Sequence, residues 1–257
     1  INEFLEEKTD IENMQPERSV IKGDITFNNV SYTYEDSQVE ALKDVSFRIE
    51  QGKTLAILGR TGSGKTSVIN LVARLFDADS GDILIDGIPI KEVNLFDLRN
   101  SIGFVPQDAF LFSDTIRNNI KIGKEDATDE EVIQAAKDAY IDHNIQEFSK
   151  KYDTLIGERG VTLSGGQKQR ISIARALISE PKILIFDDCL SAVDTETEEI
   201  ILNNLNRVRE GKTTIIVSHR PSSVKNADKI IVLHEGQIVQ RGTHDTLINI
   251  PGYYQDI

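Results

Sequence analysis

The sequence predicts an α/β fold in which a phosphate-loop (P-loop) core built on a parallel sheet carries an antiparallel β lobe and an inserted α-helical subdomain. Residues 54–58, 183–187 and 214–218 are short runs rich in Leu, Ile and Val. Runs of this length without polar alternation are typical of strands buried on both faces of a parallel sheet. Residues 25–32 and 45–49 show strand-like alternation, which predicts the antiparallel lobe.

The middle of the chain carries helix-like segments. Two polar, amphipathic segments begin at the helix-capping residues Thr128 and Asp142 and run to positions 138 and 149. A longer helix is expected over residues 166–178, because a Glu-Pro pair follows it and disfavours further helix. Together these segments predict a helical subdomain over about residues 108–178.

A glycine-rich segment lies directly after the first apolar run, at residues 59–66. Its small residues let backbone N–H groups surround phosphates, and the helix that follows points its positive end at them. Lys65 is expected to reach the β- and γ-phosphates, and Thr66 to place its hydroxyl on Mg²⁺. An ordinary glycine-rich turn is the alternative, but it would not require Lys-Thr at the helix start. The predicted phosphate-binding residues are Gly59, Arg60, Thr61, Gly62, Ser63, Gly64, Lys65, Thr66 and Ser67.

A second glycine-rich motif opens the expected long helix. Its backbone amides and serine offer further donors to a γ-phosphate, and these donors must come from outside the first pocket. Two such chains are therefore expected to clasp ATP between them, with a helix N-terminus facing phosphate across the interface. The residues of this motif are Leu163, Ser164, Gly165, Gly166 and Gln167.

The order of these motifs resembles the nucleotide-binding domain of ATP-binding cassette (ABC) transporters, from about Gly23 to the end of the chain. The resemblance implies a RecA-like core, ATP and Mg²⁺ as ligands, and head-to-tail pairing with a second nucleotide-binding domain. In this family the motif at residues 163–167 is the signature. Asp187, which ends the second apolar run, is implied to hold Mg²⁺ together with Thr66 and Gln107.

Further positions take their roles from the resemblance. Tyr34 matches the aromatic residue that stacks on adenine, and Gln107 matches the glutamine that contacts Mg²⁺ and water. Asp194 belongs to the loop that crosses the dimer interface, and His219 matches the histidine that contacts the γ-phosphate. A surface tyrosine remains the alternative for Tyr34 and is the preferred interpretation of Tyr32, while a structural histidine remains the alternative for His219. The other histidines are expected to be ordinary surface or partly buried residues: His143, His234 and His244.

Asp188 occupies the position where this family usually has the glutamate that polarises the attacking water. An aspartate withdraws the carboxylate by one methylene, roughly 1 Å, and a misplacement of that size can cost about a hundredfold in rate. Binding should survive, because the phosphate loop, Mg²⁺ and adenine stacking supply most of the affinity. We therefore expect a slow pocket whose catalytic residues are Asp188, His219 and Gln107. The intact signature is expected to complete the site of a non-identical partner, as in heterodimeric exporters with one degenerate site.

Residues 110–120 and 157–160 are similar to segments typical of exporters. In exporters the second segment contacts intracellular loops of the membrane domain, so the implied partners are the transmembrane domains of an exporter. The implied location is the cytoplasmic face of the cell membrane. Residues 1–22 resemble the acidic connector that follows a membrane domain, although a solvated charged tail would look the same; residues 23–257 are then the nucleotide-binding domain.

The composition agrees with a cassette of one large core in two lobes, since 39% of the 257 residues are hydrophobic. The chain has no tryptophan and no long apolar stretch, so we expect no membrane span within it. Its net charge of −13 argues against nonspecific nucleic-acid binding and against adhesion to an anionic membrane. A single cysteine, Cys189, excludes a disulfide within the chain and a cysteine zinc cluster, and is expected to be a small apolar filler.

Two function classes remain. The first is an energy-transducing ATPase domain that converts ATP-driven dimer closure into alternating access in an exporter. The second is a nucleotide-binding regulatory module that clamps ATP but barely hydrolyses it. We favour a combination, a subunit of an exporting ATPase whose own pocket is slow, over either extreme and over a soluble repair or translation cassette. Multidrug export is the expected role, as in the commonest bacterial heterodimers of this family.

Overall fold

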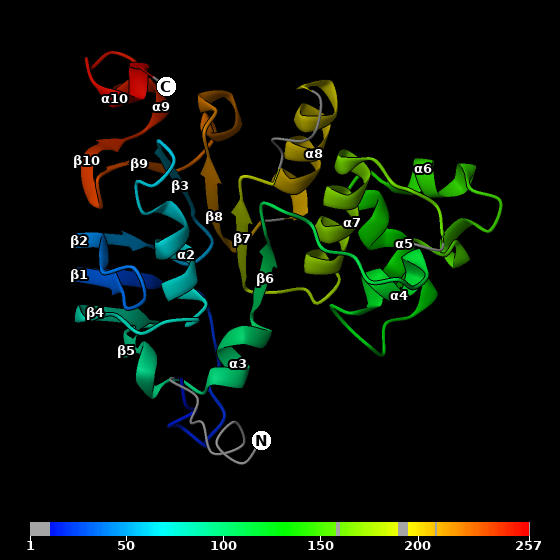
Figure 1. Cartoon of the computed structure of the whole chain (residues 1–257), viewed down its shortest axis with the longest axis horizontal. Helices are drawn as coiled ribbons and strands as arrows, with labels where there is room; N and C mark the ends of the chain where they lie inside the picture. Colours follow the sequence, from blue (N-terminus) through cyan, green and yellow to red (C-terminus); the bar gives the residue numbers. More distant parts are fainter. Residues whose placement is uncertain (1–10, 158–159, 190–194, 209, 257) are drawn as a thin grey trace.

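Two β-sheets and a helical lobe make up the structure (Figure 1). This computed structural model describes residues 11–157, 160–189, 195–208 and 210–256. None of the helices within these ranges has the length and apolar character needed to cross a bilayer. The predicted α/β class, with its parallel core, antiparallel lobe and helical insertion, is confirmed.

The larger sheet has the strand order β10-β9-β3-β8-β7-β6 among the described residues. Neighbours from β9 to β6 are parallel, and β10 returns antiparallel to β9. Leu55 and Ile57 of β3 pack into one core cluster, whereas Ala56 and Leu58 pack into a second one. Burial on both faces explains why this strand is a continuous apolar run. The strands are β3 (Thr54–Gly59), β6 (Ile102–Val105), β7 (Ile183–Asp187), β8 (Thr213–Ser218), β9 (Lys229–His234) and β10 (Gln237–Gly242).

The smaller sheet is antiparallel throughout and has the order β2-β1-β4-β5. Both predicted strands of this lobe are present and are longer than predicted. Its apolar side chains share a core cluster with α2 and with one face of the larger sheet. The elements are β1 (Ile25–Tyr34), β2 (Val39–Ile49), β4 (Ser80–Ile85), β5 (Ile88–Pro89) and α2 (Lys65–Val72).

The helical lobe lies beyond the β6–β7 edge of the larger sheet (Figure 1). Thr128 and Glu131 form a capping box at the start of α5, so the local signal for that helix is confirmed. Asp142 is the first residue of α6 and not its cap, which is Ile141, and α6 ends before the predicted residue 149 because Phe148 is extended. The helices are α4 (Ile116–Lys121), α5 (Asp129–Asp138), α6 (Asp142–Glu147) and α7 (Gly165–Leu177).

Residues 11–22 run against α3 and β4 and their flanking turns. The Asn13 side chain accepts a hydrogen bond from the Leu95 amide at 3.0 Å, and the Ser19 hydroxyl accepts one from the Asn94 amide at 2.9 Å. Arg18 forms an ion pair with Asp97. The remaining helical elements are α3 (Leu95–Asn100), α8 (Thr195–Val208), α9 (His244–Leu247), α10 (Tyr253–Asp256), and the 3₁₀ turns η1 (Ile90–Glu92), η2 (Lys151–Asp153) and η3 (Pro221–Val224).

Candidate nucleotide-binding site

One cavity of about 300 Å³ gathers most of the residues predicted to bind or hydrolyse a nucleotide. Its residues come from the carboxyl ends of the parallel strands β3, β7 and β8 and from the edge of the β lobe. Val39, Ala41 and Val217 also line it, and no motif marked them in the sequence. The predicted residues in the lining are Tyr34, Thr61, Gly62, Gly64, Lys65, Thr66, Ser67, Gln107, Asp187, Asp188 and His219.

The phosphate loop needs glycine at two close approaches. Gly59 has φ +153°, and a Cβ there would lie 2.4 Å from the Leu233 carbonyl oxygen. Gly64 has φ +101°, and a Cβ there would lie 2.4 Å from the Ala41 carbonyl oxygen. Gly64 is also the N-cap of α2 and supplies no side-chain cap. The first amides of a helix lack intrahelical acceptors, so these amides are suited to phosphate oxygens.

Lys65 and Ser63 supply further donors in the loop. The Lys65 amine donates hydrogen bonds to the carbonyl oxygens of Gly59 at 2.8 Å and Arg60 at 2.9 Å. Burial lowers the pKa of Lys65, and the charges of Asp188 and Asp187 oppose that shift. The Ser63 hydroxyl is buried and has no hydrogen-bond partner among the described residues. A buried hydroxyl without a partner is costly, so this donor set fits an anionic ligand.

Asp187 and Asp188 bring two carboxylates to the end of β7. Burial raises the pKa of Asp187, and the charge of Asp188 raises it further, while Lys65 and a hydrogen bond from Thr66 lower it. Asp187, Thr66 and Gln107 all line the cavity. Carboxylate, hydroxyl and amide oxygens are the ligand types that Mg²⁺ takes in nucleotide sites, so these residues fit the ion.

Asp188 and His219 face each other across β7 and β8. The Asp188 amide donates a hydrogen bond to the Val217 carbonyl oxygen at 2.9 Å. The Nε2 atom of His219 lies 3.9 Å from an Asp188 carboxylate oxygen. Asp188 has φ +41°, a left-handed backbone conformation that aspartate tolerates better than longer side chains do. The carboxylate and imidazole are thus close enough to act on one bound water or phosphate.

Tyr34 stands at the β-lobe side of the cavity. Its hydroxyl is hydrogen-bonded to the Ser67 hydroxyl at 3.0 Å, and its ring packs edge-on against Tyr32 and Phe76, with centroids 4.9 Å and 5.7 Å away. The preferred interpretation of Tyr32 as a surface tyrosine is wrong, because its side chain is buried in this cluster. Burial also raises the pKa of Tyr32 to about 12. The cluster holds the Tyr34 ring in place at the cavity wall.

The signature residues do not line this cavity. Ser164 caps α7 and forms a capping box with Gln167, in which the Ser164 amide donates to the Gln167 side chain at 2.9 Å. Leu163 is buried, whereas Ser164 and Gly165 are exposed. Asp194, predicted at a dimer interface, lies outside the described residues. The signature is therefore a separate surface of the chain.

The signature helix nevertheless contacts Gln107, a residue that lines the cavity. Gln169 of α7 is buried and donates a hydrogen bond to the Gln107 carbonyl oxygen. Its own side-chain oxygen has no partner among the described residues. No sequence motif marked Gln169 as a functional residue, although it lies two residues after the signature.

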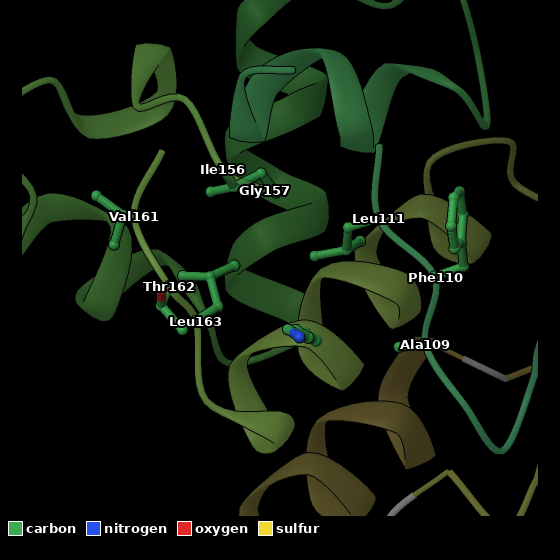
Figure 2. Close-up of a pocket in the computed structure, with 9 residues that line it drawn as sticks. Ala109, Phe110, Leu111, Ile156, Gly157, Val161, Thr162 and Leu163 are labelled. Carbon is green, nitrogen blue, oxygen red and sulfur yellow. The ribbon is translucent and has the colours of Figure 1, made fainter. Parts of the chain in front are cut away.

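A second hollow, of about 380 Å³, lies in the helical lobe. Figure 2 shows residues 109–111 on one side of it and residues 156–157 and 161–163 on the other. Phe110 is 65% exposed although it is aromatic. The hollow brings together parts of both exporter-like segments, while residues 158 and 159 lie outside the described ranges.

The other histidines contact aromatic rings. His143 packs against Tyr140 and His234 against Tyr253, with ring centroids 4.5 Å and 4.3 Å apart. His244 is hydrogen-bonded to the Tyr254 hydroxyl at 2.7 Å. Cys189 is buried, and burial raises the pKa of its thiol well above the ordinary value. These contacts agree with structural roles.

Known proteins resemble this chain in both sequence and structure. Residues 42–191 match the family profile described as ABC transporter. The whole chain is 47% identical to the probable multidrug resistance ABC transporter ATP-binding/permease protein YheI of Bacillus subtilis and covers 44% of it. It is 46% identical, over 92% of its length, to the putative multidrug export ATP-binding/permease protein YgaD of the same organism, covering 41% of that protein.

A solved structure described as a bacterial Atm1-family ABC exporter with ATP bound is similar over 99% of this chain and 45% of its own. The TM-score is 0.93 and the sequence identity is 38%. The chain therefore spans less than half the length of these relatives.

Proposed function

Since this chain belongs to the ABC transporter family, whose ATP-binding domains are ATPases, we propose that it powers the export of drug-like substrates across a membrane. The observation that carries this proposal is the single cavity that joins the phosphate loop to Gln107, Asp187, Asp188 and His219. Its relatives, named as multidrug export or resistance proteins, support the substrate class.

Each part of the cavity has a distinct role in ATP binding. The α2 amides and Lys65 hold the phosphates, and Tyr34 provides a ring on which adenine stacks. Thr66, Asp187 and Gln107 would hold Mg²⁺, and the ion would supply positive charge against the phosphates. His219 orients the γ-phosphate end of the site, 3.9 Å from the Asp188 carboxylate. Asp188 accepts a proton from the attacking water at that carboxylate.

The signature supports pairing with a second nucleotide-binding domain. Ser164 and Gly165 are exposed at the N-terminus of α7, and the signature lies outside the lining of the chain's own cavity. The Ser164 hydroxyl accepts a hydrogen bond from the Gln167 amide, which leaves its proton available to a phosphate. In a head-to-tail pair, the signature of each chain then faces the phosphates held by the other.

The hollow of Figure 2 is the proposed contact with the transmembrane domain. It combines an exposed aromatic ring, Phe110, with apolar residues next to the signature. Residues 1–22 serve as the connector to that domain, and the nucleotide-binding domain lies at the cytoplasmic face of the membrane. No nucleic acid is involved, in line with the net charge of −13.

Asp188 makes this pocket the slow one of an asymmetric pair, and the partner is a non-identical subunit with glutamate at that position. The alternative is a regulatory module that binds ATP without appreciable turnover. The aspartate at position 188 is the reason to consider a regulatory module, because its side chain is shorter than glutamate and reaches less far toward the water.

The test of the proposed function is ATP binding and hydrolysis by the purified chain and by Lys65→Ala. We expect Lys65→Ala to weaken Mg-ATP binding by at least about tenfold, because it removes a buried cation from the phosphates. Lys22→Ala, which removes an exposed lysine, is the matched control. Unchanged binding in Lys65→Ala would reject this cavity as the nucleotide site, while binding without hydrolysis would favour the regulatory module.

A further inference from the structure

A carboxylate on α8 is buried although the proposed mechanism does not use it. The Glu198 side chain is only 5% exposed. It forms an ion pair with Arg220, whose Nη1 atom donates to Oε2 at 2.9 Å, and its other oxygen accepts a hydrogen bond from the Ser223 hydroxyl. Arg220 follows His219 directly along the chain, and Ser223 lies three residues beyond Arg220.

The contacts of Glu198 span the turn that leaves β8. Arg220 precedes η3 and Ser223 lies within it, so the carboxylate holds both parts of one tight turn. The Arg220 amide also donates to the Ser218 hydroxyl at 3.0 Å. His219 is thus flanked by two residues that are each hydrogen-bonded within this turn.

Burial makes the Glu198 contacts hard to break. A carboxylate removed from water is strongly destabilising unless it is paired and hydrogen-bonded, so the turn cannot move away without exposing or stranding the charge. A charge-assisted hydrogen bond is also shorter and stronger than a neutral one. Glu198 therefore restrains the backbone that carries His219.

The same helix is connected to Asp188 through the chain. β7 ends at Asp187, Asp188 follows it, and α8 is the next helix along the sequence. β7 and β8 are paired neighbours, and Asp188 is bonded to Val217 at 2.9 Å. Glu198 therefore joins α8 to Arg220, the residue next to His219. The pairing of β7 with β8 holds Asp188 close to the same end of β8.

We propose that Glu198 is a positioning residue, which sets the place of His219 relative to Asp188 by holding Arg220 and Ser223. This inference rests on the proposed function, because the value of that placement is ATP hydrolysis at the cavity. Glu198 itself does not line the cavity and is not expected to touch nucleotide.

The first experiment observes the placement without requiring turnover. The chain has only four histidines, so the imidazole signals of His219 can be assigned by NMR using His219→Gln. We expect Glu198→Gln to shift the His219 signals and to leave those of His143, His234 and His244 in place. Arg207→Ala is the matched control, because it breaks another ion pair of α8, with Asp138 of α5, and leaves the Glu198 side chain unchanged.

Unmoved His219 signals in Glu198→Gln would overturn the proposal, and so would equal shifts of all four histidines, which indicate a general loss of structure. Should Glu198→Gln not fold, Ser223→Ala removes one contact and leaves the ion pair. The same selective shift of His219, smaller in size, is then expected, and its absence overturns the proposal.

The second experiment separates positioning from stability. In the wild-type background, Glu198→Gln is expected to lower kcat about tenfold while the KM for ATP changes less than about twofold. In a His219→Ala background the same substitution is expected to have no further effect on kcat, because Glu198 acts through His219. Additive losses would overturn the proposal. A wild-type chain without turnover would count against the proposed ATPase function alone, and the NMR result would still decide the role of Glu198.

Discussion

The backbone at Asp188 offers a physical reason for the aspartate. Its φ of +41° lies in a region that short polar residues such as Asp and Asn occupy more readily than others. A glutamate there would gain reach toward the water but would be held in a less favourable backbone conformation. A glutamate at this position is therefore expected to increase activity through its longer reach and to decrease stability through backbone strain.

Asp188→Glu is expected to raise steady-state ATP hydrolysis by about tenfold or more, because the carboxylate comes within hydrogen-bond distance of the water. The same substitution is expected to lower the free energy of unfolding by about 1 kcal/mol through the left-handed backbone. Hydrolysis should be measured at high protein concentration, with the ATP-dependent dimer fraction recorded alongside. Equal, brisk rates in both proteins would show that aspartate suffices and would remove the main support for an asymmetric partner.

Asp187→Asn is expected to stabilise the ligand-free chain near neutral pH while weakening Mg²⁺-dependent ATP binding. The pKa of Asp187 is raised by burial and by Asp188, so the folded chain holds a proton at pH values where the unfolded chain has released it. Stability therefore falls as pH rises from about 3.9, the ordinary pKa of aspartate, through the raised pKa. An asparagine does not ionise, so the fall in stability with rising pH that Asp187 causes is absent from Asp187→Asn.

The measurement for Asp187→Asn is thermal unfolding without nucleotide at about pH 5 and about pH 8. The stabilisation should be larger at the higher pH, because the loss in the wild-type chain is complete only above the raised pKa of Asp187. Asp82→Asn, at an exposed position of β4, is the control. A destabilised Asp187→Asn at high pH would show that ionised Asp187 makes favourable contacts that outweigh its burial.

At the scale of secondary structure, local signals predicted the elements that carry them in the sequence itself. Thr128 predicts the start of α5, because its capping box with Glu131 involves only residues that are close together in the sequence. The end of α6 could not be predicted, because Phe148 leaves the helix to pack against the core of the helical lobe. β6 has only four residues and takes its identity from pairing with β7, a contact that no local pattern encodes.

Gln169 of the signature helix is hydrogen-bonded to Gln107, one of the residues proposed to hold Mg²⁺. Gln169→Leu removes the hydrogen bond to the Gln107 carbonyl oxygen while keeping much of the side-chain volume. We expect the Mg²⁺ concentration needed for half-maximal hydrolysis to rise about threefold or more, and the free energy of unfolding to change by about 1 kcal/mol.

The control for Gln169 is Gln134→Leu on α5, which removes an exposed hydrogen bond to Asp138. Magnesium titrations of ATPase activity, with ATP binding measured separately without Mg²⁺, would distinguish the two variants. If Gln169→Leu behaves like Gln134→Leu, the α7 contact does not position Gln107.

On the scale of the whole molecule, the sequence predicted that the motif residues would lie together, but it did not predict the other residues that line the cavity. The motif residues come from strands of one parallel sheet, so their convergence in one cavity follows from topology. Val39 lines the apolar side of the cavity and Phe76 packs behind the Tyr34 ring, but both belong to no motif and depend on how the β lobe packs against α2. The signature lies outside this cavity, at the start of α7.

Phe110→Ser is expected to uncouple the nucleotide-binding domain from the membrane domain without impairing nucleotide binding. When the chain is joined to the transmembrane domain proposed for it, substrate-stimulated ATPase activity should fall at least about fivefold, because an aromatic anchor of the proposed contact is lost. The ATP affinity of the 257-residue chain should stay within about twofold. Phe96→Ser is a close control, since Phe96 lies on α3 and is, like Phe110, 65% exposed. Equal losses in both variants would argue against the hollow as the contact.

The capping box of Ser164 and Gln167 also bears on how fast two chains can close on ATP. Because each of these residues satisfies the other, the first turn of α7 is already rigid in the single chain. A loop that became ordered only on contact would lose conformational entropy at each closure and slow the encounter. In the proposed pair of chains that loss would belong to folding, which happens once, and each closure would begin with a signature whose first turn is already hydrogen-bonded.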